Sequence, residues 1–292
     1  MIRLDAATVL LQWAVGGLFF LWITTRRREV GIGYGWLLRG VWLVVAAGSV
    51  VAGRLVGSSA NHSPGWAAVR DGCGALVVAG CGTALVVSIV RRSAGVAGER
   101  ARQARREARV AVMTGVDRAP AVVDVSRPEF PPWLDLVAPV AGLLGVVAAA
   151  LADGGPHPLA VVRTLTGTAF LGSVSDAMLL GHWYLVQPGL SRAPLNDLVR
   201  WVTAMWPFEV GALLWPTGMP AVLSGRINDG YGGILGWFWV ACAATTLGLC
   251  LVTRAALKER AYSAVMAATG LLYLAILTAF GTDLVARAVL AA

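Results

Sequence analysis

The sequence predicts an all-α fold, a polytopic transmembrane helical bundle with about eight spans. Of the 292 residues, 57% are hydrophobic and only 14% are charged, whereas a soluble domain carries roughly a quarter charged residues. Apolar runs of about 20 residues, long enough to cross a hydrocarbon core of ~30 Å, recur along the whole chain. Arginine clusters lie between these runs, as is typical of membrane insertion. The composition therefore favours a multi-pass protein of the cell membrane over a soluble domain.

The apolar runs divide a single membrane domain, residues 1–292, into successive spans. The expected spans are 6–25, 37–57, 71–90, 134–152, 159–185, 201–223, 231–252 and 262–282. The first run is followed by its arginines, Arg26, Arg27 and Arg28. A signal peptide carries its positive charge before a shorter apolar region, so this run is expected to remain as the first helix.

Basic residues are distributed unequally between the two sides of the predicted membrane. Of the 24 lysines and arginines, 18 lie in the connections 26–39, 91–132, 186–200 and 253–261. Connections rich in Lys and Arg stay in the cytoplasm. Residues 91–132 are therefore predicted to form a cytoplasmic basic loop, and both termini are predicted to lie outside the cytoplasm.

The first part of that loop, residues 91–109, is predicted to continue the third span as a basic helix. One interpretation is binding to anionic lipid, at ~1 kcal/mol per basic residue near the surface. The alternative is a solvated segment that only sets the topology. No aromatic residue interrupts it, which argues against nucleic acid. The bilayer is thus the expected partner, and other membrane subunits are a second open class.

Two spacings indicate an internal repeat of two four-helix parallel halves. Trp22 and Arg39 are 17 residues apart across the first cytoplasmic turn, and Trp183 and Arg200 are 17 apart across the third. Four helices per half would preserve orientation and place the repeat axis along the membrane normal. Tryptophan and arginine also gather at membrane interfaces without any repeat, so both interpretations stay open.

The most unusual stretch, residues 175–195, places polar side chains inside a predicted span. Asp176 lies within the fifth span, and Glu209 lies within the sixth. A carboxylate at mid-membrane costs ~2.5–3.5 kcal/mol on insertion scales, so such residues usually face protein and mark proton, ion or ligand sites. The alternative is a structural carboxyl group that binds an adjacent helix. In both cases Asp176 and Glu209 are expected to face protein and not lipid.

His182, Trp183 and Tyr184 close the fifth span near the predicted cytoplasmic face. They are candidates for a pocket closed by the turn from Pro188 to Pro194, with the imidazole as a polar contact for a quinone carbonyl. Successive helical residues are 100° apart, so in a regular helix His182 alone is expected to face inward. The alternative is an aromatic belt at headgroup level.

Several chemistries are excluded or not predicted. Only one intramembrane histidine exists, which excludes a haem held by two histidines of this chain. The sequence contains no phosphate-binding loop, zinc-protease motif or nucleophile elbow, and it assigns no cofactor. His62 and His157 lie in short loops near Asp71 and Asp153, but their spacing does not predict a metal site. Asp283, at the end of the last span, is expected to be solvated.

Two functions of different classes remain. The first is a membrane subunit or binding protein for a lipid-soluble ligand such as a quinone, bound near His182, Trp183 and Tyr184. The second is a proton-coupled small-molecule transporter in which Asp176 and Glu209 exchange protons. An enzyme acting on a lipid is not supported, because no nucleophile or metal set is recognisable.

Overall fold

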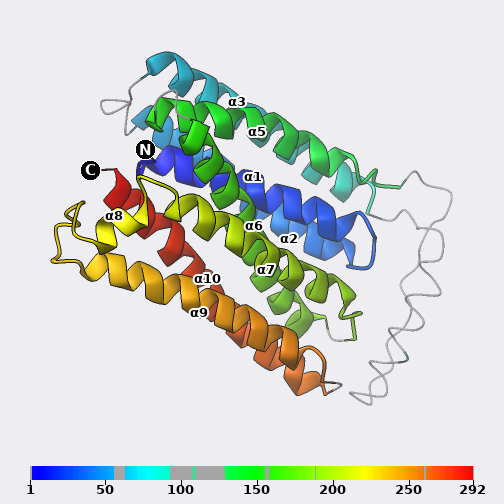
Figure 1. The fold of residues 1–292 in the computed structure, drawn as a ribbon. Coiled ribbons are helices and arrows are strands. Elements are labelled where there is room, and N and C mark those ends of the chain that lie inside the picture. Colours follow the sequence, from blue (N-terminus) through cyan, green and yellow to red (C-terminus); the bar gives the residue numbers. More distant parts are fainter. Residues whose placement is uncertain are drawn as a thin grey trace.

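The computed structural model describes residues 2–55, 63–92, 108, 129–154, 158–187, 189–259 and 261–291. Within them, eight long helices alternate in direction and a short ninth helix lies between two of them (Figure 1). The helices are α1 (Ala6–Thr25), α2 (Ile32–Leu55), α3 (Pro64–Val90), α5 (Leu134–Gly154), α6 (Pro158–Val186), α7 (Ala193–Leu214), α8 (Met219–Leu223), α9 (Ile234–Ala256) and α10 (Tyr262–Leu290). The predicted all-α fold is confirmed for this part of the chain.

Six of these helices, α1, α2, α3, α5, α9 and α10, are long and apolar enough to cross a membrane, which indicates a multi-pass membrane protein. Their outer faces carry large apolar side chains: Val44, Leu144 and Leu277 are 71%, 68% and 69% exposed. So much exposed apolar surface is not compatible with water but suits contact with acyl chains. The predicted cytoplasmic loop 91–132 and its 91–109 segment lie almost entirely outside the described residues.

The other two long helices, α6 and α7, are less apolar for different reasons: α6 carries polar side chains inside the bundle, whereas the first turns of α7 carry Asn196, Asp197 and Arg200 at its basic end. Helix α6 packs against α1, α5, α7 and α10, and most of its residues are buried. Asp176 on α6 and Glu209 on α7 are both fully buried. A helix surrounded by protein does not need an apolar outer face, so the low hydropathy of α6 follows from its central position.

The long helices pack as two rings of four. In the N-terminal ring, α1 contacts α2, α2 contacts α3, α3 contacts α5, and α5 returns to α1. In the C-terminal ring, α6, α7, α9 and α10 follow the same order. The spacing that suggested a repeat is not matched in detail, however, because Arg39 is buried whereas the Arg200 side chain is 68% exposed.

The two rings meet where α1 crosses α6. A Cβ atom added to Gly16 would overlap the carbonyl oxygen of Thr168, and one added to Gly172 would overlap the backbone of Gly16. Glycine at both positions lets the two backbones touch, as at other close helix crossings in membranes. The rings are therefore joined by direct backbone contact at the centre of the bundle.

A buried ion pair joins α2 to α5. The Arg39 guanidinium donates from Nε and Nη2 to the two Asp135 oxygens, both at 2.7 Å, and the two side chains are 3% and 2% exposed. Thr25 donates to the same carboxylate at 3.1 Å, and the Phe130 ring lies 4.4 Å from the guanidinium carbon. Arg39 was expected in a connection, but α2 begins at Ile32 and brings it inside the bundle.

Figure 1 places both termini at one end of the bundle. We name this the terminal end, and we name the opposite end, with the connections after α1, α3, α6 and α9, the basic end. The range 201–223, predicted as the sixth span, is covered by two helices, because α7 ends at Leu214 and α8 begins at Met219. Pro216 and Gly218 lie between them, and proline removes a backbone donor and restricts the residue before it.

Candidate functional site

Asp176 lies at the middle of α6 beside two aromatic residues of α2. It is 0% exposed, as are Tyr34 and Trp42. Its carboxyl group interacts electrostatically with the Tyr34 hydroxyl, and the Trp42 indole lies beside it outside hydrogen-bond geometry. None of the three polar groups has a hydrogen-bond partner among the described residues. Asp176 faces protein, as predicted.

Glu209 lies on α7 in the terminal half of the bundle, next to a hydrogen-bonded cluster. Arg287 donates to Asp283 at 2.8 Å and to the side-chain oxygen of Gln12, and Gln12 donates to Asp283 at 3.5 Å. Glu209 interacts electrostatically with both Asp283 and Arg287. It is 0% exposed, and within the described part of the chain neither of its oxygens has a hydrogen-bond partner. Glu209 also faces protein, as predicted.

Asp283 belongs to this cluster, so the expectation that it is solvated is wrong. It is 0% exposed, and Arg287 is 1% exposed. Helix α10 continues to Leu290, two turns beyond the expected end of the last span at residue 282. The added turns carry Arg287 onto the face of Asp283, because residues four apart lie on one side of a helix.

Arg163 caps the end of α7 from the neighbouring helix α6. Its guanidinium donates to the carbonyl oxygens of Ala212, Trp215 and Thr217 at 2.9, 2.8 and 3.0 Å. The last carbonyl groups of a helix have no partner within it, and a cation near them is stabilised by the helix dipole. Arg163 is 2% exposed and also interacts electrostatically with Glu209.

Asp153 lies near the terminal surface, at the end of α5. It is 5% exposed, and no described residue gives either of its oxygens a hydrogen-bond partner. It interacts electrostatically with Arg70 and Arg287. His62 and His157, weighed with it as metal ligands, lie outside the described residues.

The three consecutive candidates His182, Trp183 and Tyr184 point in three directions. His182 is exposed and its Nδ1 lies 2.9 Å from the hydroxyl of Tyr273 on α10. Trp183 donates to Gln187 at 3.1 Å and lies against Tyr34. The expected inward orientation of His182 is therefore wrong: the regular helix turns it to the outer surface and turns Tyr184 inward.

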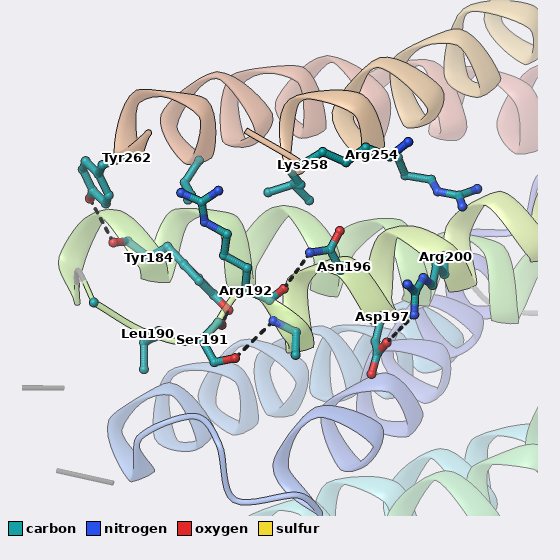
Figure 2. A pocket seen from close by; sticks show the side chains of 14 residues that line it. Tyr184, Leu190, Ser191, Arg192, Asn196, Asp197, Arg200, Arg254, Lys258 and Tyr262 are labelled. Carbon is teal, nitrogen blue, oxygen red and sulfur yellow. Dashed lines mark hydrogen bonds and ion pairs between the residues drawn. The ribbon is translucent and has the colours of Figure 1, made fainter. Parts of the chain in front are cut away.

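Tyr184 is buried and helps to line a pocket of about 1100 Å³ at the basic end. The pocket lies between the α6–α7 connection and the ends of α9 and α10, and we name it the basic-end pocket. Four cationic residues line it, Arg192, Arg200, Arg254 and Lys258, together with Tyr184 and Tyr262. Figure 2 shows Arg254 and Lys258 opposite the side of α7 that carries Asn196 and Arg200. Pro188, expected to close the pocket, lies outside the described residues, but Gly189 to Ala193 line it.

The four cationic side chains of the basic-end pocket differ in their hydrogen bonds and ion pairs. Arg200 donates to Asp197 at 3.3 Å, and Arg192 donates to the carbonyl oxygens of Glu259 and Ala261. Neither Arg254 nor Lys258 forms an ion pair within the described ranges. These two side chains therefore leave positive charge available to an anion in the pocket.

No family model, curated protein or solved structure matches this chain. The geometry described above is therefore the only basis for a function. It offers two polar regions at opposite ends of the bundle: the basic-end pocket, and the carboxyl and guanidinium cluster around Glu209.

Sequence reasoning missed most of the cluster around Glu209. Arg163 and Arg287 lie outside the four connections that hold most of the basic residues, and Gln12 lies inside the first apolar run, so the sequence analysis singled out none of the three. The available signal was position, since Gln12 and Arg163 both lie several residues inside apolar runs. A polar residue at that depth usually has a partner on another helix, but the sequence does not name the partner.

Proposed function

We propose that the chain is an eight-span protein of the cell membrane with both termini outside the cytoplasm. The six apolar helices support several spans, and the central packing of α6 lets a less apolar helix cross with them. Together with α7 this gives eight crossings in alternating direction. The excess of arginines at the basic end then places that end in the cytoplasm.

The topology can be tested by cysteine labelling in a cysteine-free background. A cysteine placed at Ser93 or Ser126 in the predicted cytoplasmic loop is expected to be protected in intact cells from a membrane-impermeant maleimide. A cysteine at Ser224, at the terminal end, is expected to react, and permeabilised cells provide the control for reactivity. Labelling of residue 93 or 126 in intact cells would contradict this orientation.

We also propose that the two rings are the halves of a duplicated four-helix unit. The same order of contacts in both rings supports this, as does the parallel direction of α1 and α6, the first helix of each. The equivalents would be α1 with α6, α2 with α7, α3 with α9 and α5 with α10. A parallel repeat of this kind has its axis along the membrane normal, where α1 meets α6.

For the function itself, we propose that the protein binds an amphiphile with an anionic headgroup in the basic-end pocket. The observation that carries this proposal is the pair Arg254 and Lys258, which line the pocket without an ion-pair partner among the described residues. Basic pockets between membrane helices on the cytoplasmic side suit anionic lipid headgroups. Tyr184 and Tyr262 add apolar area beside the charges.

The charge of the pocket also decides between ligand classes. A neutral quinone gains little from cations, whereas a phosphate or carboxylate forms charge-assisted hydrogen bonds with arginine and lysine. His182, the residue expected to contact a quinone carbonyl, lies on the outer surface and does not line the pocket. An anionic amphiphile therefore fits this pocket better than the quinone first considered.

The binding test compares the wild-type chain with Arg254→Gln/Lys258→Gln in nanodiscs. Each basic residue near an anionic surface contributes ~1 kcal/mol, so the double variant is expected to bind phosphatidylglycerol about 30-fold more weakly. Native mass spectrometry, with phosphatidylcholine as the neutral lipid, measures the retained lipid.

The matched control is Arg226→Gln, which removes one charge at the terminal end and should leave retention unchanged. Adding inorganic phosphate separates two sources of the anion, because displacement of the lipid by phosphate would identify a soluble phosphate site. Equal retention of phosphatidylglycerol by the wild type and the double variant would contradict the proposal.

A further inference from the structure

The terminal half of the bundle holds more carboxyl groups than guanidinium groups. One of its guanidinium groups, Arg70, is already paired with two carboxylates, those of Asp5 at 2.8 Å and Asp71 at 2.9 Å. Three carboxyl side chains, Asp153, Glu209 and Asp283, lie around two guanidinium groups, Arg163 and Arg287. All five are at most 5% exposed. If every one were ionised, the cluster would hold an unbalanced negative charge in a medium of low dielectric constant, which is strongly unfavourable.

The hydrogen bonds indicate which carboxyl group is ionised and paired with Arg287. Asp283 accepts from Arg287 at 2.8 Å and from Gln12 at 3.5 Å. A Cβ atom on Gly167 would lie 2.7 Å from both the Asp283 oxygen and the Gln12 nitrogen, so the cluster packs directly on α6. Asp283 and Arg287 thus form the neutral pair of the cluster.

Among the described residues, Arg163 does not contact a carboxylate directly. Its three donated hydrogen bonds go to carbonyl oxygens at the end of α7. Its charge reaches Glu209 only electrostatically. One more carboxylate can therefore be balanced by Arg163. Because Arg70 is already shared by Asp5 and Asp71, no cation is left for the remaining carboxyl group, which is then neutral.

Glu209 and Asp153 are the two carboxyl groups left to share that proton. Around Glu209, α6 contributes Arg163 and Thr166, and α10 contributes Asp283 and Arg287. Helix α1 contributes only the uncharged Gln12, α8 has no charged residue, and the single charged residue of α9, Arg254, lies at the basic end. Asp153 in turn faces Asp5 and Arg70 at the surface and Arg287 within the bundle.

We propose that this cluster binds one exchangeable proton, held by Glu209 and exchanged with the aqueous phase at the terminal end by way of Asp153. The proposal rests on Glu209 and Asp153, two buried carboxyl groups that have no hydrogen-bond partner among the described residues. A buried polar group without a partner is rare and calls for a ligand, a water or a proton. Arg287 interacts electrostatically with both. The step is a proton transfer alone: a carboxylic acid gives its proton to a carboxylate or to water, and the vacated carboxylate is stabilised by the two guanidinium groups.

The test uses infrared spectroscopy of the full chain in liposomes, where a protonated carboxyl group absorbs apart from carboxylates and amides. The wild type is expected to show this absorption, and Glu209→Gln is expected to lose the Glu209 part of it. In heavy water, exchange of the carboxyl proton for deuterium shifts this absorption. The shift should be at least about tenfold slower in Asp153→Asn than in the wild type, because the proton acceptor near the surface is removed. Asp229→Asn is the control: hydrogen bonds from the backbone amides of Gly233 and Tyr231 lower the pKa of Asp229, which is therefore ionised and should contribute nothing.

Every result of these experiments either supports or contradicts the proposal. Glutamine is the neutral counterpart of a neutral glutamic acid, so Glu209→Gln should melt within about 4 °C of the wild type. A large loss of stability would mean that Glu209 is ionised in the folded state, which would overturn the proposal. An unchanged carboxylic-acid absorption in Glu209→Gln, or an unchanged exchange rate in Asp153→Asn, would overturn it as well.

Discussion

Replacing Gly16 by alanine is expected to separate the two rings of the bundle. The new methyl group would overlap the carbonyl oxygen of Thr168, which belongs to a helix backbone and cannot rotate away as a side chain would. Overpacking costs typically 1–3 kcal/mol, and we expect about 3 kcal/mol here because both partners are backbone. The variant should melt about 10 °C below the wild type in a detergent thermal-shift assay.

Alanine at Gly270 on α10 is the matched control, because nothing lies within 4 Å of a Cβ atom built there. Alanine is favoured over glycine in a helix by about 1 kcal/mol, so Gly270→Ala should melt at or above the wild-type temperature. Gly172→Ala should melt at about the same temperature as Gly16→Ala, since both added methyl groups disturb the crossing of α1 and α6. Similar melting temperatures for Gly16→Ala and Gly270→Ala would show that α1 and α6 are not in backbone contact.

Asp135→Ala is expected to lower stability at least as much, because it leaves Arg39 charged, buried and without its carboxylate. Removing one partner of a buried ion pair costs about 3–5 kcal/mol. The remaining contact, with the Phe130 ring, does not accept the guanidinium hydrogen bonds. The expected result is a melting temperature roughly 10 °C or more below the wild type, or a loss of monodisperse protein on gel filtration.

The exposed pair of Arg200 and Asp197 provides the comparison. Its N–O distance is 3.3 Å and the Arg200 side chain is 68% exposed, so Arg200→Ala should change stability by less than about 1 kcal/mol. The double variant Arg39→Met/Asp135→Leu should recover most of the loss, because apolar side chains can replace a buried pair. A double variant as unstable as Asp135→Ala would mean that the pair is not the source of the effect.

The sequence was sufficient for the helices but not for their partners. Apolar runs predicted α1 at its observed bounds and α5 and α6 within two residues, since length and hydropathy depend only on the chain itself. They failed at α7, where Pro216 and Gly218 end the helix, and at α2 and α10, which extend further than their apolar runs. The close crossing at Gly16 was also missed, because Gly16 is followed by Gly17 and Gly172 shares its run with Gly167 and Gly181, so the sequence does not single out the pair.

The candidate site was predicted in the same uneven way. Burial of Asp176 and Glu209 followed from the cost of a carboxylate in lipid. The cluster next to Glu209, by contrast, is assembled from α1, α6 and α10, and no spacing in the sequence relates residue 12 to residues 283 and 287. The orientation of His182 was wrong because the direction of the bundle interior depends on where α10 packs, which the sequence of α6 does not specify.

The position of α6 has a consequence for how the protein is made. A helix that carries Arg163, Asp176 and several serines and threonines is a poor substrate for insertion by itself, since one aspartate at its centre costs ~2.5–3.5 kcal/mol. During synthesis, however, α1 to α5 emerge first and can close their ring before α6 leaves the ribosome. We therefore expect the nascent α6 to meet a finished surface with Gly16 exposed on it, so that the N-terminal ring acts as a template for the second half of the chain.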